Sequence, residues 1–388
     1  MSLPVHSRQA ASVDDRAMVN AIVKVRREVH DQRVDSLVRC LEGKPGGYSG
    51  LRAAYADATG NLHVPANFVD AMLGAEGAYD SRRSVNERLT ESLTTSSWSN
   101  VLGDALHRRL VAEYQTTPGL QAWRYLVSNQ SFNVDFRNQR MEKIGGYGLL
   151  PTVAQGAPYN PLPSPANDSE ATYAISKKGG TEDLTLETFA SDDVGAVRRI
   201  ITTLARAAAN TLNRAVLDLL VTNAAIYDGV VLFHASHNNL TATPLNTITL
   251  DTLRIKMRKQ AHLGDANDVL GVVPRFIIVP PELEQTALAL LDTYNAQTIS
   301  TLDALHEPLD LIVAAHYASA TGWYLAADPA SSPTIEVGFS EATSDPAMII
   351  QGPDTQMGSA YTSDKVTLKL RHPWGIGVPD FRGLAKGN

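Results

Sequence analysis

A long segment rich in glycine and proline, which leads directly into a long helical pattern, is the feature that most constrains this fold. Between Gly145 and Gly180 the chain carries too many of these helix breakers to form a helix. Residues 172–176 and 184–187 alternate as strands do, which predicts a two-stranded excursion with its tip near Gly156 to Asp168. Because a lone hairpin of that length is only marginally stable in water, we expect it to pack on a surface outside itself. We interpret that surface as another copy of the chain.

The pattern that follows predicts one long helix, with Asp192 or Asp193 placed to cap its start. Apolar residues recur at helical spacing without a break, at Val197, Ile200, Ile201, Leu204, Ala208, Leu212, Ala215, Val216 and Leu219. A helix over residues 192–222 would be roughly 45 Å long, at about 1.5 Å per residue. The alanines around Ala208 favour helix and allow a neighbouring element to approach closely.

Composition limits the class of protein. A chain of 388 residues is expected to form at least two lobes. The sequence contains no apolar run long enough to span a membrane and no signal-peptide pattern at its start, so we predict no membrane partner. Cys40 is the only cysteine, which excludes an internal disulfide framework and fits a reducing cytoplasm. A net charge of -7 argues against a surface that grips nucleic acid through its phosphates.

The first quarter of the chain reads as an arm with peripheral elements. Residues 18–42 predict a charged amphipathic helix that ends at the glycines of 43–47. The Ser-, Thr- and Asn-rich stretch 93–100 predicts a loop, and 102–114 predicts a short helix.

After Leu240 the pattern predicts a mixed α/β lobe. We expect a helix over about 250–261, a buried strand over 272–279 and a second helix that opens at Pro280-Pro281. Further strands are predicted at 309–315, 322–327, 334–339 and 365–371, followed by a turn at 374–377.

Among the sequence motifs, the pair His234 and His237 most resembles a metal-binding site. Zinc needs three or four ligands, and no third Cys or His lies near this pair. We interpret the pair, together with Asn238 and Asn239, as a structural turn, because Asn tolerates left-handed backbone and bonds its own main chain. We therefore predict no catalytic residue, no metal and no cofactor.

Three other patterns are weaker. A serine nucleophile built from Ser236, His234 and Asp228 lacks the Gly-x-Ser-x-Gly elbow. The glycines of 145–148 lack the Lys and the following helix of a phosphate loop. The basic run Arg254, Lys256, Arg258 and Lys259 reads as a solvated helix face, with an intersubunit or DNA-facing patch as the alternative.

The residues now described carry a resemblance to a known family. The chain resembles the major capsid proteins of tailed phages, and among them the Mu-like major head subunits, through the runs 148–159, 192–193, 232–240, 323–329, 364–371 and 374–377. The resemblance is strong from about Tyr125 to Leu240 and weaker towards the C-terminus. It implies an α+β chain with the Hong Kong 97-like capsid fold.

The resemblance also implies a division of the chain. Residues 1–132 would form the N-terminal arm and the start of the peripheral domain, and 133–188 the extended loop. The spine helix would span 189–223, the axial domain 224–345, and the C-terminal return to the peripheral domain 346–388. Intersubunit contacts of the loop are expected at Gly156, Pro158, Tyr159, Pro161 and Tyr173, and packing of the spine helix at Ile200, Leu204, Ala208, Leu212 and Leu219.

The implied function is a structural one. The chain would assemble with itself into hexamers and pentamers of an icosahedral head, in the host cytoplasm, and enclose double-stranded DNA without reading its sequence. Portal, scaffold and decoration proteins are the further partners expected. Some relatives join loop lysines to a C-terminal asparagine. Lys143, Lys177 and Lys178 are present here, but no Asn lies between Asn295 and Asn388, so we predict no such bond.

Two alternatives remain open. An encapsulin-like compartment that holds enzyme cargo shares the fold, and the long N-terminal region disfavours it. A cytosolic hydrolase that uses the His234 and His237 region is the alternative from a different class. Many relatives lose an N-terminal scaffolding segment to a protease, and the sequence leaves open whether the N-terminal region of this chain is processed.

Overall fold

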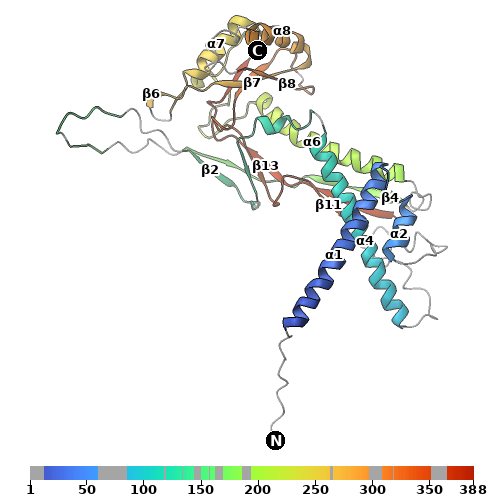
Figure 1. Cartoon of the computed structure of the whole chain (residues 1–388). Coiled ribbons are helices and arrows are strands. Elements are labelled where there is room, and N and C mark those ends of the chain that lie inside the picture. Colours follow the sequence, from blue (N-terminus) through green and yellow to red (C-terminus); the bar gives the residue numbers. More distant parts are fainter. Residues whose placement is uncertain are drawn as a thin grey trace. The chain divides into compact units, whose positions relative to one another are not determined.

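The computed structural model describes residues 13–59, 85–117, 119–132, 134–143, 150–156, 158–161, 169–185, 194–262, 265–296, 308–317, 319–350 and 365–388. The chain divides into two compact units, each built from separate segments (Figure 1). Unit 1 comprises Met1–Tyr114, Gly179–Ala205 and Ala347–Arg371, and unit 2 comprises Gln115–Lys178, Arg206–Pro346 and His372–Asn388. Mixed helices and sheets confirm the α+β class.

Unit 1 contains the N-terminal helices α1 (Val13–Glu42), α2 (Leu51–Thr59) and most of α4 (Val85–Thr116). Helix α1 ends at Glu42, as predicted from the glycines of 43–47. Gly43 takes a left-handed φ of 70°, and its N–H donates to the carbonyl of Cys40 at 3.1 Å. Helix α1 is also tied to α4 by ion pairs, with Arg108 reaching Asp31 at 2.7 Å and Asp35 at 3.0 Å.

The loop predicted at 93–100 is wrong, because α4 runs through this stretch without interruption. Ser, Thr and Asn disfavour helix by only a fraction of a kcal/mol each, roughly 0.5, so tertiary packing easily overrides them. Further along the same helix, Val101, Ala105 and Leu106 are buried at helical spacing. Packing of this apolar face, rather than local propensity, sets the length of the helix.

The sheet of unit 1 has the order β11-β12-β4, with all pairs antiparallel. Its strands are β4 (Gly179–Thr185), β11 (Ala347–Ile350) and β12 (Lys365–Arg371). The strand predicted at 365–371 is confirmed. The strand predicted at 184–187 begins earlier, as β4, and pairs with β12 rather than with the hairpin.

Unit 2 is organised around a sheet of order β14-β9-β7-β8. Its strands are β7 (Pro274–Val279), β8 (Asp310–Val313), β9 (Trp323–Ala327) and β14 (Leu384–Gly387). Helices α7 (Thr247–Arg258) and α8 (Pro281–Ala296) share one hydrophobic cluster with Ile277, Trp323 and Leu325. The alternate residues Ile278 and Tyr324 face a second cluster, which includes the C-terminal half of α6. Three layers result (Figure 1).

A second sheet of unit 2 has the order β1-β10-β13, formed by Asn129–Ser131, Glu336–Phe339 and Trp374–Gly377. The turn predicted at 374–377 is therefore wrong, because these residues pair antiparallel with β10. The predicted two-stranded excursion is confirmed at its base, where β2 (Gln139–Lys143) pairs with β3 (Ser169–Tyr173). Most of the segment predicted as its tip lies outside the described residues. A short pair, β5 (Ala261–His262) and β6 (Asp265–Val269), completes the unit.

Helix α6 (Val194–Thr222) confirms the predicted long helix and runs from unit 1 into unit 2. The proposed caps Asp192 and Asp193 lie outside the described residues. Of the predicted packing residues, Ala208 and Leu212 are buried, whereas Ile200, Leu204 and Leu219 are only half-buried. Further buried residues of this helix are Val197, Ile201 and Val216, which belong to the predicted pattern, and Ala205, Ala209 and Leu220, which do not.

Candidate functional site

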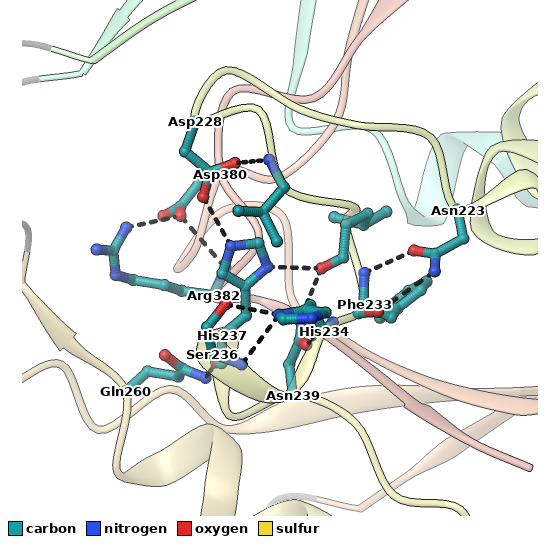
Figure 2. A network of polar contacts seen from close by, with 12 residues as sticks. Asn223, Asp228, Phe233, His234, Ser236, His237, Asn239, Gln260, Asp380 and Arg382 are labelled. Atoms are coloured by element: carbon teal, nitrogen blue, oxygen red, sulfur yellow. Dashed lines mark hydrogen bonds and ion pairs between the residues drawn. The ribbon is translucent and has the colours of Figure 1, made fainter.

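The chain reverses direction directly after α6, at Asn223. This residue has a left-handed φ of 48°, and its side chain bonds both polar backbone groups of Phe233. A short hairpin lies between them, closed by a bridge from Ala225 to Val231. Figure 2 shows the polar network that gathers around this reversal, all of it within unit 2.

His234 begins a single turn of 3₁₀ helix, η3 (Ala235–His237). Its Nδ1 accepts the backbone N–H of Ser236 at 3.2 Å and lies 2.8 Å from the Ser236 hydroxyl. Asn238 ends the turn in a left-handed conformation, with φ of 51°. The predicted structural turn is thus present, and His234 acts in it as the N-terminal cap.

His237 is buried, and both of its ring nitrogens have acceptors (Figure 2). Nε2 lies 2.7 Å from Oδ2 of Asp228, and Nδ1 lies 3.1 Å from the carbonyl oxygen of Leu232. The ring stacks on Phe381, with centroids 3.9 Å apart. Because carbonyl and carboxylate oxygens only accept, both contacts are satisfied when both ring nitrogens carry hydrogens.

The carboxyl group of Asp228 responds to this contact. Burial alone would raise its pKa, but hydrogen bonds from the backbone N–H of Val230 and from His237 outweigh burial and lower the pKa below its ordinary value. Asp228 is therefore a carboxylate held ready to bind His237 at neutral pH.

Asn239 is fully buried and links the turn to the C-terminal strand. Its side chain accepts from the N–H of His234 at 3.1 Å and donates to the carbonyl of Leu232 at 2.9 Å. Its own carbonyl accepts the N–H of Lys386 in β14 at 2.8 Å. Gln260, just after α7, donates to the carbonyl of His237 at 2.8 Å. The turn therefore joins segments that are far apart in sequence.

A buried ion pair closes the network. Nη1 of Arg382 lies 2.9 Å from Oδ1 of Asp380, and Nε of Arg382 donates to the carbonyl of Ala261 at 2.6 Å. The guanidinium also lies over the ring of Phe381, 4.8 Å from its centroid. Sequence reasoning missed Asp380, Phe381, Arg382 and Gln260, because no local motif connects them to the turn.

The geometry opposes a catalytic role for these residues. Asp228 contacts His237 rather than His234, so Ser236, His234 and Asp228 form no relay. Over the part of the chain that the structure describes, no group of three or more metal-binding side chains is found. Within those same residues, no helix is long and apolar enough to cross a membrane. The arrangement ties strands and turns together.

The predicted contact residues of the excursion divide into two kinds. Gly156, Pro158, Tyr159 and Pro161 are exposed, and the side chain of Tyr159 is 87% accessible. Tyr173, in contrast, is only 6% accessible and packs inside its own unit. Its hydroxyl donates to Oε1 of Glu336 at 3.1 Å. Burial, and then the charge of Glu336, raises the pKa of Tyr173 to about 12.

These features define a class of protein. The chain holds a hydrogen-bonded turn after α6, a long helix that runs through both units and an exposed loop segment at 150–156 and 158–161, and the residues of that turn form no catalytic arrangement. A family model described as phage capsid protein matches residues 169–387, more than half of the chain. The chain belongs to this family of phage capsid proteins, and the predicted function as a capsid shell protein is confirmed.

Similar solved structures carry low sequence identity. A chain from Mycobacterium phage Ogopogo is 13% identical, with 70% of this chain and 93% of that chain covered and a TM-score of 0.39. The capsid of cyanophage Pam1 is 9% identical, with coverage of 64% and 84% and a TM-score of 0.41. An encapsulin complex from Synechococcus elongatus is 12% identical, with coverage of 71% and 88% and a TM-score of 0.40. No curated protein matches the chain in sequence. The assignment to Mu-like head subunits stays a prediction.

Proposed function

We propose that the chain is the major subunit of an icosahedral phage head, assembled in the host cytoplasm from hexamers and pentamers around double-stranded DNA. Its work is structural, with no catalytic step. Membership in the capsid family is the observation that carries this proposal. Portal, scaffold and decoration proteins would complete the particle.

The exposed loop supports the proposal physically. Leu150 and Tyr159 are 78% and 87% accessible, although large apolar side chains gain free energy when they leave water. Gly156, with a left-handed φ of 79°, shapes the turn between them. A neighbouring copy would cover these side chains, and repetition around a closed shell would multiply a modest contact energy.

The division into domains remains our proposal. We assign 133–188 to the extended loop, 189–223 to the spine helix and 224–345 to the axial domain, with 1–132 and 346–388 in the peripheral parts. In support, β12 pairs with β4 inside unit 1. Strands β13 and β14 instead join the sheets of unit 2, so the C-terminal return would apply to β12.

The proposal is tested with a variant of the loop. Leu150→Ser combined with Tyr159→Ser removes two exposed apolar side chains, so the subunit itself should fold and melt as the wild type does. In negative-stain images, we expect the overexpressed wild-type protein to form shells and the variant to remain as free subunits or capsomers. A wild type that stays monomeric under all conditions would contradict the function, and normal shells from the variant would contradict the role of the loop.

Two finer points have their own readouts. Nucleic acid inside the particles supports a phage head, whereas protein cargo would favour the encapsulin-like alternative.

We also propose that no covalent bond joins the subunits. Lys178 supports this, because its Nζ donates to the carbonyl of Trp374 at 3.2 Å and lies over the ring of that residue. A ladder above the monomer on a denaturing gel of purified particles would contradict it.

A further inference from the structure

Helices α7 and α8 lie in the same layer of unit 2 but cover different parts of its sheet (Figure 1). Helix α7 packs on β14, which is one edge strand, whereas α8 packs on β7 and β8, which include the opposite edge strand. The two helices therefore lie over opposite edges of one face of the sheet, and the described residues of unit 2 leave the outward face of each helix exposed.

The outward face of α7 combines apolar residues with positive charge, and the exposed Asp251 on the same stripe pairs with Arg254 at 3.4 Å. Ile248 and Ile255 are 79% and 45% accessible, and their spacing of seven residues places them on one stripe. Arg258 and Lys259 follow Ile255 by three and four residues and are exposed. Among the described residues, neither cation has a carboxylate within ion-pair distance. Nearby, Lys256 is engaged with the carbonyl of Leu240 at 2.7 Å.

The outward face of α8 has the complementary composition. Leu288 is 46% accessible and stands between Glu284 and Asp292, four residues away on either side, both of them exposed. Helix α8 contains no Lys or Arg along its length. Over the part of the chain described here, no cation lies within ion-pair distance of these two carboxylates.

Helix dipoles explain only part of this distribution. Acidic residues in the first turn of α8 and basic residues in the last turn of α7 each stabilise their own helix. Asp292 is different, because it lies in the C-terminal half of α8, where the dipole disfavours negative charge. The dipole also gives no reason for Ile248, Ile255 and Leu288 to be exposed. A contact between copies that covers the outward faces of α7 and α8 would explain both the position of Asp292 and the exposure of these apolar residues.

We propose that α7 of one copy docks against α8 of the next copy. Leu288 would lie between Ile248 and Ile255, and Arg258 and Lys259 would pair with the carboxylates of α8. The matching stripes are roughly 12 to 17 Å long, at about 1.5 Å per residue. Because the two surfaces occupy different places on one chain, the contact is head-to-tail, and such a contact forms a ring when the rotation between successive copies closes. This inference rests on the proposed function and gives its capsomers a defined contact.

Charge reversal tests the contact. One variant carries Arg258→Glu and Lys259→Glu, a second carries Glu284→Lys and Asp292→Lys, and a third carries all four changes. We expect each two-site variant to associate roughly tenfold more weakly, because like charges then face each other in every contact of the ring. The four-site variant restores opposite charges and should regain association. Sedimentation of the full chain measures association, and melting curves show whether each variant is folded.

A matched control preserves every charge, with Arg258→Lys, Lys259→Arg, Glu284→Asp and Asp292→Glu in one chain, and should associate as the wild type does. Wild-type association should also fall with salt, since the screening length drops from about 8 Å at 0.15 M to about 3 Å at 1 M. Failure of the four-site variant to recover, while folded, would overturn the proposal. So would normal shells from the α7 variant that have lost only their DNA, which would assign α7 to DNA instead.

The outcome is separate from that of the proposed function. Rings that depend on these charges but never close into shells would support the contact and contradict the phage head. Shells that form regardless of either reversal would support the head and contradict the contact.

Discussion

His237 donates through Nε2 to the carboxylate of Asp228 at 2.7 Å, while its ring stacks on Phe381 at 3.9 Å. One buried side chain thus joins the hairpin after α6 to the segment that leads into β14. His234 and His237 most resembled a metal or catalytic motif in the sequence, yet His237 serves to hold distant segments of unit 2 together, and His234 caps the turn between them.

The first prediction concerns Asp228→Asn, which removes the charge but keeps the shape. Loss of a hydrogen bond to a charged group should lower the free energy of unfolding by about 1.5 to 3 kcal/mol at pH 7. Because the folded pKa of Asp228 lies below the ordinary value of 3.8, its contribution is present above that pH and is lost as the pH falls through the folded pKa. The gap between wild type and variant in urea unfolding should therefore narrow in acid.

Asp135→Asn is the control for that experiment, since this exposed carboxylate also accepts the backbone N–H two residues on, that of Arg137 at 2.9 Å, but its ion pair with Nε of Arg137 is long, at 3.7 Å. It should change the unfolding free energy by less than about 0.5 kcal/mol. An equally large loss of unfolding free energy in both variants would contradict a specific stabilising contact between Asp228 and His237.

The second prediction separates Asn238 from Asn239, which the sequence groups in one turn. Asn238→Gly should be nearly neutral, because glycine adopts the left-handed conformation of this position without strain. Asn239→Gly should cost about 2 to 4 kcal/mol, because it deletes two buried hydrogen bonds and leaves a void. Thermal unfolding of both variants provides the comparison, and equal losses would contradict these roles.

Helical periodicity predicted α6 and α8, whose burial follows one face, and a continuous apolar run predicted β7, which is buried on both faces. Helix α6, helix α8 and strand β7 all lie within a few residues of their predicted ranges. In α6 the predicted stripe contains both Ile200 and Ile201, but the structure buries only Ile201 fully and leaves Ile200 half-buried. Only the packing partner decides which of two adjacent apolar residues is buried.

Local rules failed where distant residues decide the structure. Trp374–Gly377 reads as a turn because of its glycines, yet it is a strand. A Cβ on Gly375 would lie 2.4 Å from the carbonyl oxygen of Ala174, so glycine serves a close approach of two chain segments. Distant residues also decide the structure of the turn at His234–Asn239. Asp380, Phe381 and Arg382 meet the turn only in three dimensions, and one sequence carries no signal for that encounter.

The third prediction concerns His372, whose pKa is lowered to about 4, mainly because the ring is buried. Its Nε2 donates to the carbonyl of Ser344 at 3.0 Å, which the neutral ring can do. The unfolded ring has its ordinary pKa of 6.5, so below that pH the unfolded state binds a proton that the folded state does not. The contribution of His372 to the free energy of unfolding is therefore fully present above pH 6.5 and is lost as the pH falls from about 6.5 to about 4. Melting temperatures across this range should fall less for His372→Gln. Parallel curves would contradict the assignment.

The fourth prediction concerns Tyr173→Phe, which deletes the hydroxyl that binds Glu336. Ser131 also donates to this carboxylate, at 2.6 Å, so the loss should be moderate, about 1 to 2 kcal/mol at pH 7. Because the folded pKa of Tyr173 is raised to about 12, its contribution is present below pH 10 and is lost as the pH rises through about 12. Tyr159→Phe is the matched control. This side chain is exposed, so stability should not change, and a loss equal to that of Tyr173→Phe would count against the buried contact.

The last prediction uses two adjacent glycines of β4. A Cβ on Gly179 would lie 2.1 Å from the backbone oxygen of Leu370 in the paired strand β12, whereas a Cβ on Gly180 would meet no atom of the described residues within 4 Å. Gly179→Ala must therefore push two backbones apart and should cost about 3 kcal/mol or more, comparable to severe overpacking.

Gly180→Ala reduces the freedom of the unfolded chain without a clash, so it should be neutral or stabilise by up to about 1 kcal/mol. Urea unfolding of the two variants measures the difference. If the variants behave alike, the register in which Gly179 faces Arg371 is wrong, and the pairing of β4 with β12 must be redrawn.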